Sequence, residues 1–163
     1  MPVRPQETVP TLLQVDAILV RLTGTNALAE VARFLRAQFH HYRWVGAYRR
    51  KAGQLELVAY DGELPTSSGP FPMEEATFGR AATTGRGVLV PDRPPAGPPR
   101  AVGSEARCLL VVPLKEGADV TGFFEVDGDH ERALDASDQR LLEAIGAKLG
   151  SAARAAPPVE GPA

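Results

Sequence analysis

Residues 121–127 read Thr-Gly-Phe-Phe-Glu-Val-Asp, and this stretch decides the fold expected for the chain. Alternate residues of a β-strand share one face, so Phe123, Glu125 and Asp127 are expected to lie together. The apolar residues between them point the other way and suit packing against helices. The strand is therefore expected to separate a hydrophobic core from a site.

A second strand with two different faces is expected at residues 42–49, where Trp44, Gly46 and Tyr48 share one side. An aromatic box beside two carboxylates suits a small ligand with a cationic amine, through cation–π attraction and charge-assisted hydrogen bonds. A free amino acid fits that description, and so do other amines. The candidate ligand-binding residues are Trp44, Tyr48, Phe78, Phe123, Glu125 and Asp127.

The alternative for the aromatic residues is that Trp44 and Tyr48 simply fill a core, as large rings often do. Glu125 and Asp127 favour a site, because carboxylates inside a small domain must be paired or solvated. Arg80, Glu105 and Arg107 are interpreted as features of a solvated rim. The carboxylate pair therefore carries the prediction of a pocket.

Apolar spacing predicts helices near both ends of the chain. Residues 11–22 place apolar side chains three and four apart, which is typical of a helix with one buried stripe. A second helix is expected up to residue 39, and a terminal helix, capped by Asp135 or Ser137, ends before Pro157. The stripe of the first helix comprises Leu12, Val15, Leu19 and Leu22.

Between these helices, short runs of β-branched and aromatic residues predict strands. Residues 51–54 form the turn between the first two strands. The segment 73–84 is interpreted as a short helix that stops at Gly85. Prolines within residues 92–105 prevent that segment from continuing a ladder. The expected strands cover residues 42–49, 55–60, 88–90, 108–114 and 120–126.

These elements predict a single α+β domain. A chain of 163 residues suits one core, and short connections between strands favour an antiparallel sheet. The domain is expected to span residues 11–156, with disordered tails at 1–10 and 157–163.

Several motifs in this order resemble the GAF domain family. The resemblance implies a central antiparallel sheet of five to six strands, with the N- and C-terminal helices on one face and a ligand pocket on the other. It covers nearly everything from the second helix to residue 150. The motifs are Trp-Val-Gly-Ala-Tyr at 44–48, Phe-Gly-Arg-Ala-Ala-Thr-Thr-Gly at 78–85, Val-Pro-Asp at 90–92, Leu-Val-Val-Pro-Leu at 110–114, and residues 121–127.

Within that family, the sequence is most similar to free methionine-(R)-sulfoxide reductases, which share the Trp-Val-Gly-aromatic-Tyr run and the two alternating acidic residues. That resemblance implies a thiolate nucleophile and resolving cysteines. Here Phe78, Val102 and roughly Ser68 occupy the cysteine positions. Cys108 lies elsewhere, and Leu109 replaces an acidic residue of the pattern. The sequence keeps part of a binding box and lacks the catalyst.

Composition and motifs exclude several other classes. A net charge of −2 gives no general attraction to nucleic acid. No apolar run is long enough to span a membrane or to act as a signal peptide, and one cysteine permits no intrachain disulfide. These features favour a cytoplasmic protein. The histidines and Cys108 lack metal-ligand spacing, so no metal and no cofactor are expected.

Three functions remain open. The first is a non-catalytic, sensory or regulatory GAF domain that binds a free amino acid or related amine. The second is a reductase-like enzyme acting through Cys108, although the missing cysteines argue against enzymatic activity. The third is a dimerisation scaffold with an empty pocket. In the first and third cases the terminal helices are expected to form a homodimer, because the stripe of the first helix exceeds what a small sheet can cover.

Overall fold

The computed structural model describes residues 3–65, 69–73, 75–92 and 108–157. The expected tail from residue 158 onward and most of the proline-containing segment 92–105 lie outside these ranges. The helices are α1 (Pro5–Arg21), α2 (Gly24–Gln38), α3 (Arg80–Thr84), α4 (Ala136–Gly146) and α5 (Gly150–Ala155), and a π-helical turn, η1 (Glu75–Gly79), precedes α3. The strands are β1 (Tyr42–Lys51), β2 (Gln54–Asp61), β3 (Phe71–Pro72), β4 (Val88–Val90), β5 (Leu109–Glu116) and β6 (Asp119–Gly128).

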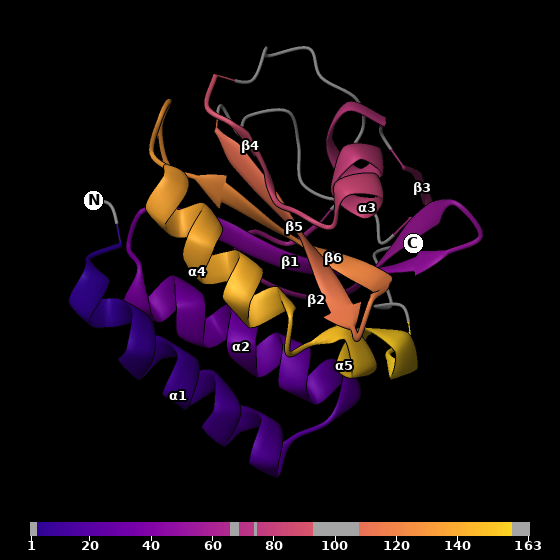
Figure 1. Ribbon diagram of the computed structural model, residues 1–163, viewed down its shortest axis with the longest axis horizontal. Helices are drawn as coiled ribbons and strands as arrows, with labels where there is room; N and C mark the ends of the chain where they lie inside the picture. Colours follow the sequence, from indigo (N-terminus) through magenta and orange to yellow (C-terminus); the bar gives the residue numbers. More distant parts are fainter. Residues whose placement is uncertain (1–2, 66–68, 74, 93–107, 158–163) are drawn as a thin grey trace.

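The six strands form one antiparallel sheet in the order β3-β2-β1-β6-β5-β4. The two strands with mixed faces, β1 and β6, are therefore neighbours at its centre. The hairpins β1–β2 and β5–β6 lie on either side of this centre, where β1 and β6, which are far apart in the sequence, pair with each other (Figure 1). The predicted α+β fold with an antiparallel sheet is confirmed.

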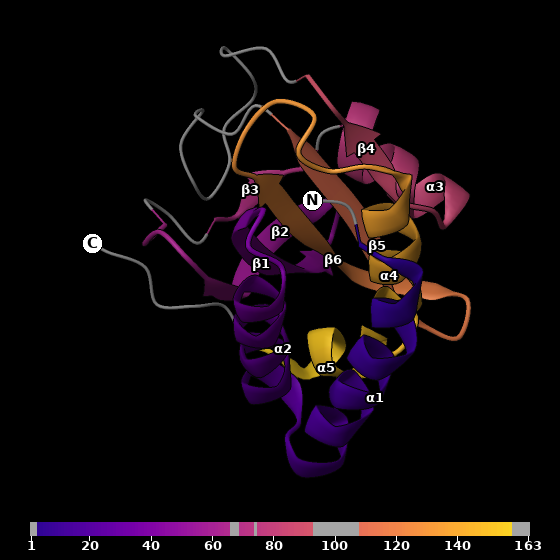
Figure 2. The same cartoon turned by 90° about the vertical axis from the view of Figure 1, so that its left-hand side faces the viewer.

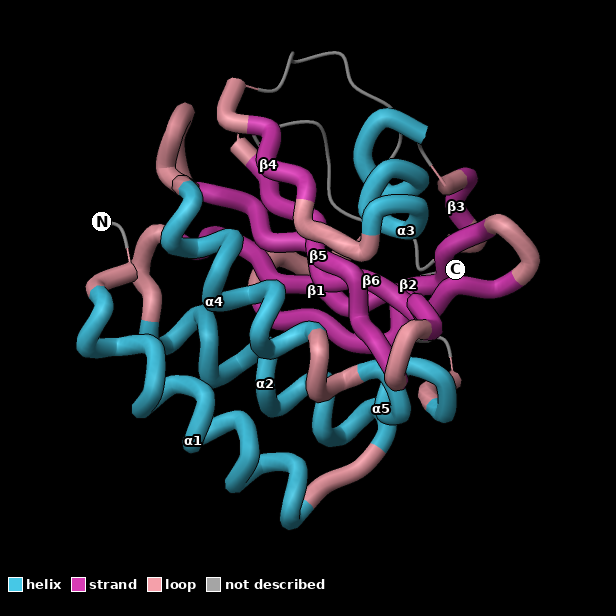
Figure 3. Tube along the Cα trace, viewed as in Figure 1, coloured by secondary structure: helices cyan, strands magenta, loops and turns pink. Residues whose placement is uncertain are grey.

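Four helices cover one face of this sheet. In Figure 1 and, turned by 90°, in Figure 2, α1, α2, α4 and α5 lie on one side, and α3 lies on the other. The tube in Figure 3 shows the same helical layer beside the sheet. Val45, Ala47, Phe124 and Val126, which alternate with the candidate site residues, are fully buried in the core beneath the four helices. Because alternate side chains of these strands lie on opposite faces, the core residues and the candidate site residues are on different sides of the sheet.

The first helix begins at Pro5, inside the segment 1–10 that was expected to be a tail. Proline suits the first helical position, where its missing N–H would be unsatisfied anyway. The carboxylate of Glu7 accepts a hydrogen bond from the Arg4 N–H at 2.7 Å, and the buried Val3 donates its N–H to Ser137 Oγ at 3.1 Å. Local capping and a long-range contact therefore anchor a segment without apolar periodicity.

Within the stripe Leu12, Val15, Leu19 and Leu22, Val15 is buried in the domain and the three leucines are half-buried against the same core. The stripe contacts the core beneath the helices, which leaves a different apolar set exposed on α1. That set comprises Val9, Leu13 and Val20, with exposed fractions of 64%, 62% and 86%.

Two other predicted helices differ in detail. The segment 73–84 forms the π-helical turn η1 followed by α3, and it stops at Gly85 as predicted, with φ of +69°. The terminal helix divides into α4 and α5 around residues 147–149. Gly150 must pass close to the sheet, because a Cβ at this position would lie 2.0 Å from the carbonyl carbon of Lys115.

A buried polar network lies at one end of the helix-covered face. Asp138, fully buried in the first turn of α4, accepts hydrogen bonds at 2.8 Å from the Tyr42 hydroxyl and pairs with His41 Nε2 at the same distance. Its second oxygen accepts the N–H of Asp135, the N-cap residue of α4. Each oxygen of this carboxylate is thus bonded, as burial of a charge requires.

Candidate functional site

The central strand pair brings the predicted site residues together on the face away from the four helices. In the antiparallel register, Tyr48 lies opposite Phe123, Gly46 opposite Glu125, and Trp44 opposite Asp127. Directly opposed residues on one face have Cβ atoms about 5 Å apart, so their side chains form one surface. Residues almost eighty positions apart therefore become neighbours.

Trp44 lies flat against the sheet at the edge of this surface. A Cβ on Gly46 would be 2.0 Å from the indole ring, so only glycine leaves room for it. The ring stacks on Tyr60 at a centroid distance of 6.4 Å and an interplanar angle of 15°. Its Nε1 donates a hydrogen bond to the carbonyl of Glu63 at 3.1 Å. The indole is therefore fixed by contacts on two sides.

Four aromatic rings continue from this surface in a chain of edge-to-face contacts. Phe71, Tyr48, Phe78 and Phe123 follow one another with centroid distances of 6.1, 5.6 and 5.3 Å. Phe78 reaches the chain from η1, and this placement explains why the turn lies over the sheet. The rings are buried and form a hydrophobic cluster separate from the core beneath the helices.

The two carboxylates lie beside this aromatic cluster, and each is only 1% exposed. The hydroxyl of Tyr48 donates to Glu125 Oε1 at 3.3 Å. Asp127 lies between Trp44 on β1 and Leu109 on β5 in the register of the sheet. Carboxylates at this depth attract cations and hydrogen-bond donors strongly, because little water screens them.

The structure thus gathers all six predicted residues on one sheet face. Sequence reasoning missed several apolar neighbours that complete this surface. Leu55 and Leu57 follow the alternation of β2, which could have indicated them. Tyr60 returns to this face only after an irregularity in the strand, and Phe71 belongs to a two-residue strand that periodicity cannot detect. The missed residues are Leu55, Leu57, Tyr60, Phe71, Leu109 and Val111.

Cys108 lies on the other side of the sheet. Its side chain is fully buried in the core beneath the helices, whereas the candidate site belongs to the opposite cluster. Burial raises the pKa of the Cys108 thiol, so the nucleophilic thiolate is disfavoured. Of the residues at the cysteine positions, Phe78 lies within the site, and Ser68 and Val102 lie outside the described residues. The predicted route through Cys108 has no access to the carboxylates.

Among the residues that the structure describes, no group of three histidine, cysteine, aspartate or glutamate side chains is placed to hold a metal ion. Within the same ranges, no helix is both long and apolar enough to cross a membrane. His41 belongs to the buried network with Asp138.

A six-stranded antiparallel sheet, with four helices on one face and a buried aromatic and acidic cluster on the other, defines a small α+β domain. The sequence model of the GAF domain matches residues 23–153. The chain therefore belongs to the GAF domain family, whose members commonly bind small molecules.

Solved structures with this fold include enzymes and other GAF domains. Free methionine-R-sulfoxide reductase from Neisseria meningitidis, in complex with its substrate, is 26% identical over 88% of this chain and 87% of that chain, with a TM-score of 0.73. The enzyme from Staphylococcus aureus, also with substrate, is 20% identical over 95% and 100%, with a TM-score of 0.74. The GAF domain of an Acinetobacter phosphoenolpyruvate-protein phosphotransferase is 16% identical over 93% of this chain and 94% of that chain, with a TM-score of 0.73. No curated protein sequence matches this chain significantly.

Proposed function

We propose that this protein is a non-catalytic, sensory or regulatory GAF domain that binds a free amino acid or related amine on the face of β1 and β6. One observation carries the proposal: Glu125 and Asp127 are buried beside Trp44 and Tyr48 on one sheet face. An ammonium group between the carboxylates would be desolvated and paired, while the aromatic rings contact the rest of the ligand.

The absence of catalysis follows from the chemistry of the residues present. Sulfoxide reduction through a protein thiol needs a thiolate beside the sulfur and a second thiol to form a disulfide. The chain has one cysteine, and it lies beneath the helices with a raised pKa. Binding without turnover is the activity that this site supports.

Access to the site requires movement. Because both carboxylates are 1% exposed, a ligand reaches them only when covering side chains shift. Phe78 on η1 is the described residue that bridges Tyr48 and Phe123, with centroid distances of 5.6 and 5.3 Å. We expect association to be slower than about 10⁵ M⁻¹s⁻¹, the lower end for binding without a conformational step.

The test is a thermal-shift screen of methionine, methionine sulfoxide, other amino acids and simple amines, followed by calorimetric titration of those that stabilise the protein. Glu125→Gln should weaken binding at least tenfold, because it removes the charge that faces the ammonium group. Glu30→Gln on α2 is a matched control, since its carboxylate pairs with Arg33 on the surface. Failure of every amino acid and amine to bind the wild-type protein would overturn the proposal.

Catalysis is tested separately by NADPH-coupled turnover of free methionine sulfoxide with thioredoxin. The expected result is no turnover above the background without protein. Turnover that disappears in Cys108→Ser would establish the reductase alternative and contradict the non-catalytic assignment.

A homodimer is a second candidate property, favoured by the exposed apolar residues of α1. Val9, Leu13 and Val20 recur on the side of the helix opposite to Val15 and Ile18, which are buried. A helix that is apolar on two sides gains from packing against a second copy of itself. Light scattering at micromolar concentration tests this property, and a monomer would remove it.

A further inference from the structure

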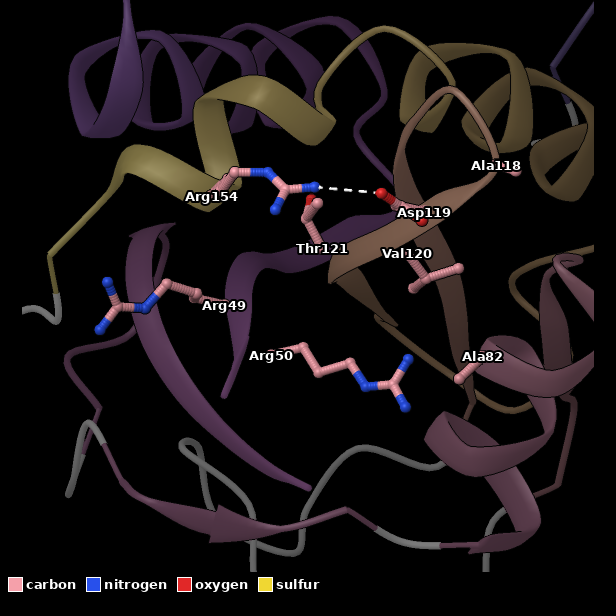
Figure 4. Close-up of a pocket in the computed structure, with 8 residues that line it drawn as sticks. All are labelled: Arg49, Arg50, Ala82, Ala118, Asp119, Val120, Thr121 and Arg154. Atoms are coloured by element: carbon pink, nitrogen blue, oxygen red, sulfur yellow. Dashed lines mark hydrogen bonds and ion pairs between the residues drawn. The ribbon is translucent and has the colours of Figure 1, made fainter. Parts of the chain in front are cut away.

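A cavity of about 460 Å³ opens at one end of the sheet, where β1 ends and β6 begins. It lies between α3 and α5, and Figure 4 shows its side chains. None of the six candidate amine-site residues lines it. The lining residues are Arg49, Arg50, Ala82, Ala118, Asp119, Val120, Thr121 and Arg154.

Arginines outnumber acidic residues among the side chains that line this cavity. Three arginines line it together with one aspartate. Figure 4 shows Arg154 reaching from α5 toward Asp119, while the guanidinium groups of Arg49 and Arg50 point in opposite directions below it. Because Arg49 and Arg50 are consecutive residues of β1, they lie on opposite faces of the sheet, and an anion in the cavity can pair with one of them.

Internal acceptors use only part of the donor capacity of these arginines. Arg154 pairs with Glu116 at 2.8 Å and with Asp119 at 3.5 Å. Arg49 Nη2 donates to Glu56 Oε1 at 3.2 Å, but its Nε is buried without a hydrogen-bond partner among the described residues. A buried donor without an acceptor costs about 1–3 kcal/mol, so Arg49 favours an additional acceptor on its own side of the sheet, which is the side covered by the helices.

Among the lining arginines, Arg50 has the most hydrogen-bond donors without a protein acceptor. Within the part of the chain that the structure describes, its guanidinium makes no hydrogen bond and no ion pair, although it lines the cavity. A guanidinium presents five N–H donors in a planar fork that matches carboxylate and phosphate oxygens. A bound oxyanion would give Arg50 a partner without competing with an existing ion pair.

We propose that this cavity binds a small organic molecule that carries a carboxylate or phosphate group. The oxyanion pairs with Arg50, whose side chain lies on the same side of the sheet as Ala82 and Val120. Ala82, Ala118 and Val120 provide apolar contacts for a short carbon skeleton, and a volume of about 460 Å³ falls within the range of small-molecule sites. If the proposed function is correct, the protein would thus hold an ammonium group beside Glu125 and an oxyanion beside Arg50.

The experiment is calorimetric titration of the full chain with inorganic phosphate and, separately, with succinate, at constant ionic strength adjusted with sodium chloride. Arg50→Gln should weaken binding at least tenfold and should leave the unfolding midpoint unchanged. Arg21→Gln at the end of α1 removes the same charge from another exposed position and should keep wild-type affinity. Binding of only one probe supports the site and selects the group that it recognises.

Two results would overturn the proposal. The first is that neither probe binds, or that Arg21→Gln weakens binding as much as Arg50→Gln, which would indicate a non-specific charge effect. The second is that Glu125→Gln alters phosphate affinity as much as Arg50→Gln does, which would place the anion at the other site. If no amine or amino acid binds but phosphate still does, the result would contradict the proposed function and would leave the anion site intact.

Discussion

The two faces of the central sheet are built from the same strands but differ in what they bury. The face beneath the helices is lined mostly by small and branched apolar residues, with Phe39 and Phe124 among the few large rings, and its polar network around Asp138 is confined to one end. The other face combines aromatic rings with Glu125 and Asp127 at its centre. The difference shows how one strand can contribute alternate residues to a stabilising core on one side and to a candidate ligand site on the other.

Phe123 and Phe124 provide the sharpest test of this comparison, because they are adjacent, fully buried and belong to opposite clusters. Phe124→Ala should lower the free energy of unfolding by about 5 kcal/mol, and Phe123→Ala by about 3 kcal/mol. The second cavity can partly collapse, since Phe78 lies on the short turn η1. Urea denaturation measures both values. Equal losses would mean that the two faces are equally rigid.

A matched pair of tyrosines tests the polar groups of the two faces. Tyr42→Phe removes a 2.8 Å hydrogen bond to Asp138 and should cost about 2 kcal/mol. Tyr48→Phe removes a 3.3 Å hydrogen bond to Glu125 and should cost about 0.5 kcal/mol, with a larger effect on amine affinity. Chemical denaturation and titration calorimetry separate the two effects. The reverse order of stability losses would contradict the assignment of faces.

The same tyrosine predicts an alkaline loss of stability. Burial, together with the nearby Asp138, raises the pKa of Tyr42 well above 10.0. Because the folded pKa is raised, the contribution is present below the unfolded pKa and is lost as the pH rises through the folded value. Unfolding midpoints measured between pH 8 and pH 11 should therefore fall less steeply in Tyr42→Phe than in the wild-type protein.

The N-cap of α4 should give a smaller effect at acidic pH. Burial raises the pKa of Asp135, but hydrogen bonds from Ser137 and Asp138 together lower it below its usual value of 3.8. A depressed pKa contributes stability above the unfolded value, and that stability is lost as the pH falls through the folded value. Asp135→Ala should cost about 1 kcal/mol at pH 7.

Asp135→Asn is the control for this titration. It retains a capping oxygen without a carboxyl group that titrates. Its unfolding midpoint should change less than that of the wild-type protein between pH 5 and pH 2. An unchanged acid dependence would show that other carboxyl groups determine it.

The smallest effect on stability is expected at the outer surface of the helical layer. Leu13→Lys or Val20→Lys should change the free energy of unfolding by no more than about 0.5 kcal/mol, because both side chains are mostly exposed. If α1 pairs with a second copy, either change should shift light-scattering mass toward the monomer. A dimer that persists in both variants would place its interface elsewhere.

The sequence predicted the elements whose periodicity is strong. The strands around Trp44 and Phe124 and the helix stop at Gly85 follow from alternation and glycine chemistry. The start of α1 could not be predicted, because Pro5–Pro10 lacks an apolar repeat and is held by Glu7 and by the contact between Val3 and Ser137. Tertiary contacts of this kind leave no periodic signal.

For the candidate site too, the sequence predicted some features, whereas others depended on the tertiary structure. Alternation alone placed Trp44 with Tyr48 and Glu125 with Asp127, because the side-chain period of a strand is fixed by its backbone. Only the tertiary structure decided that β1 and β6 pair in a register that joins these groups, that Phe78 closes over them, and that Cys108 lies beneath the helices. Strand order and register depend on contacts between distant segments, which no local pattern encodes.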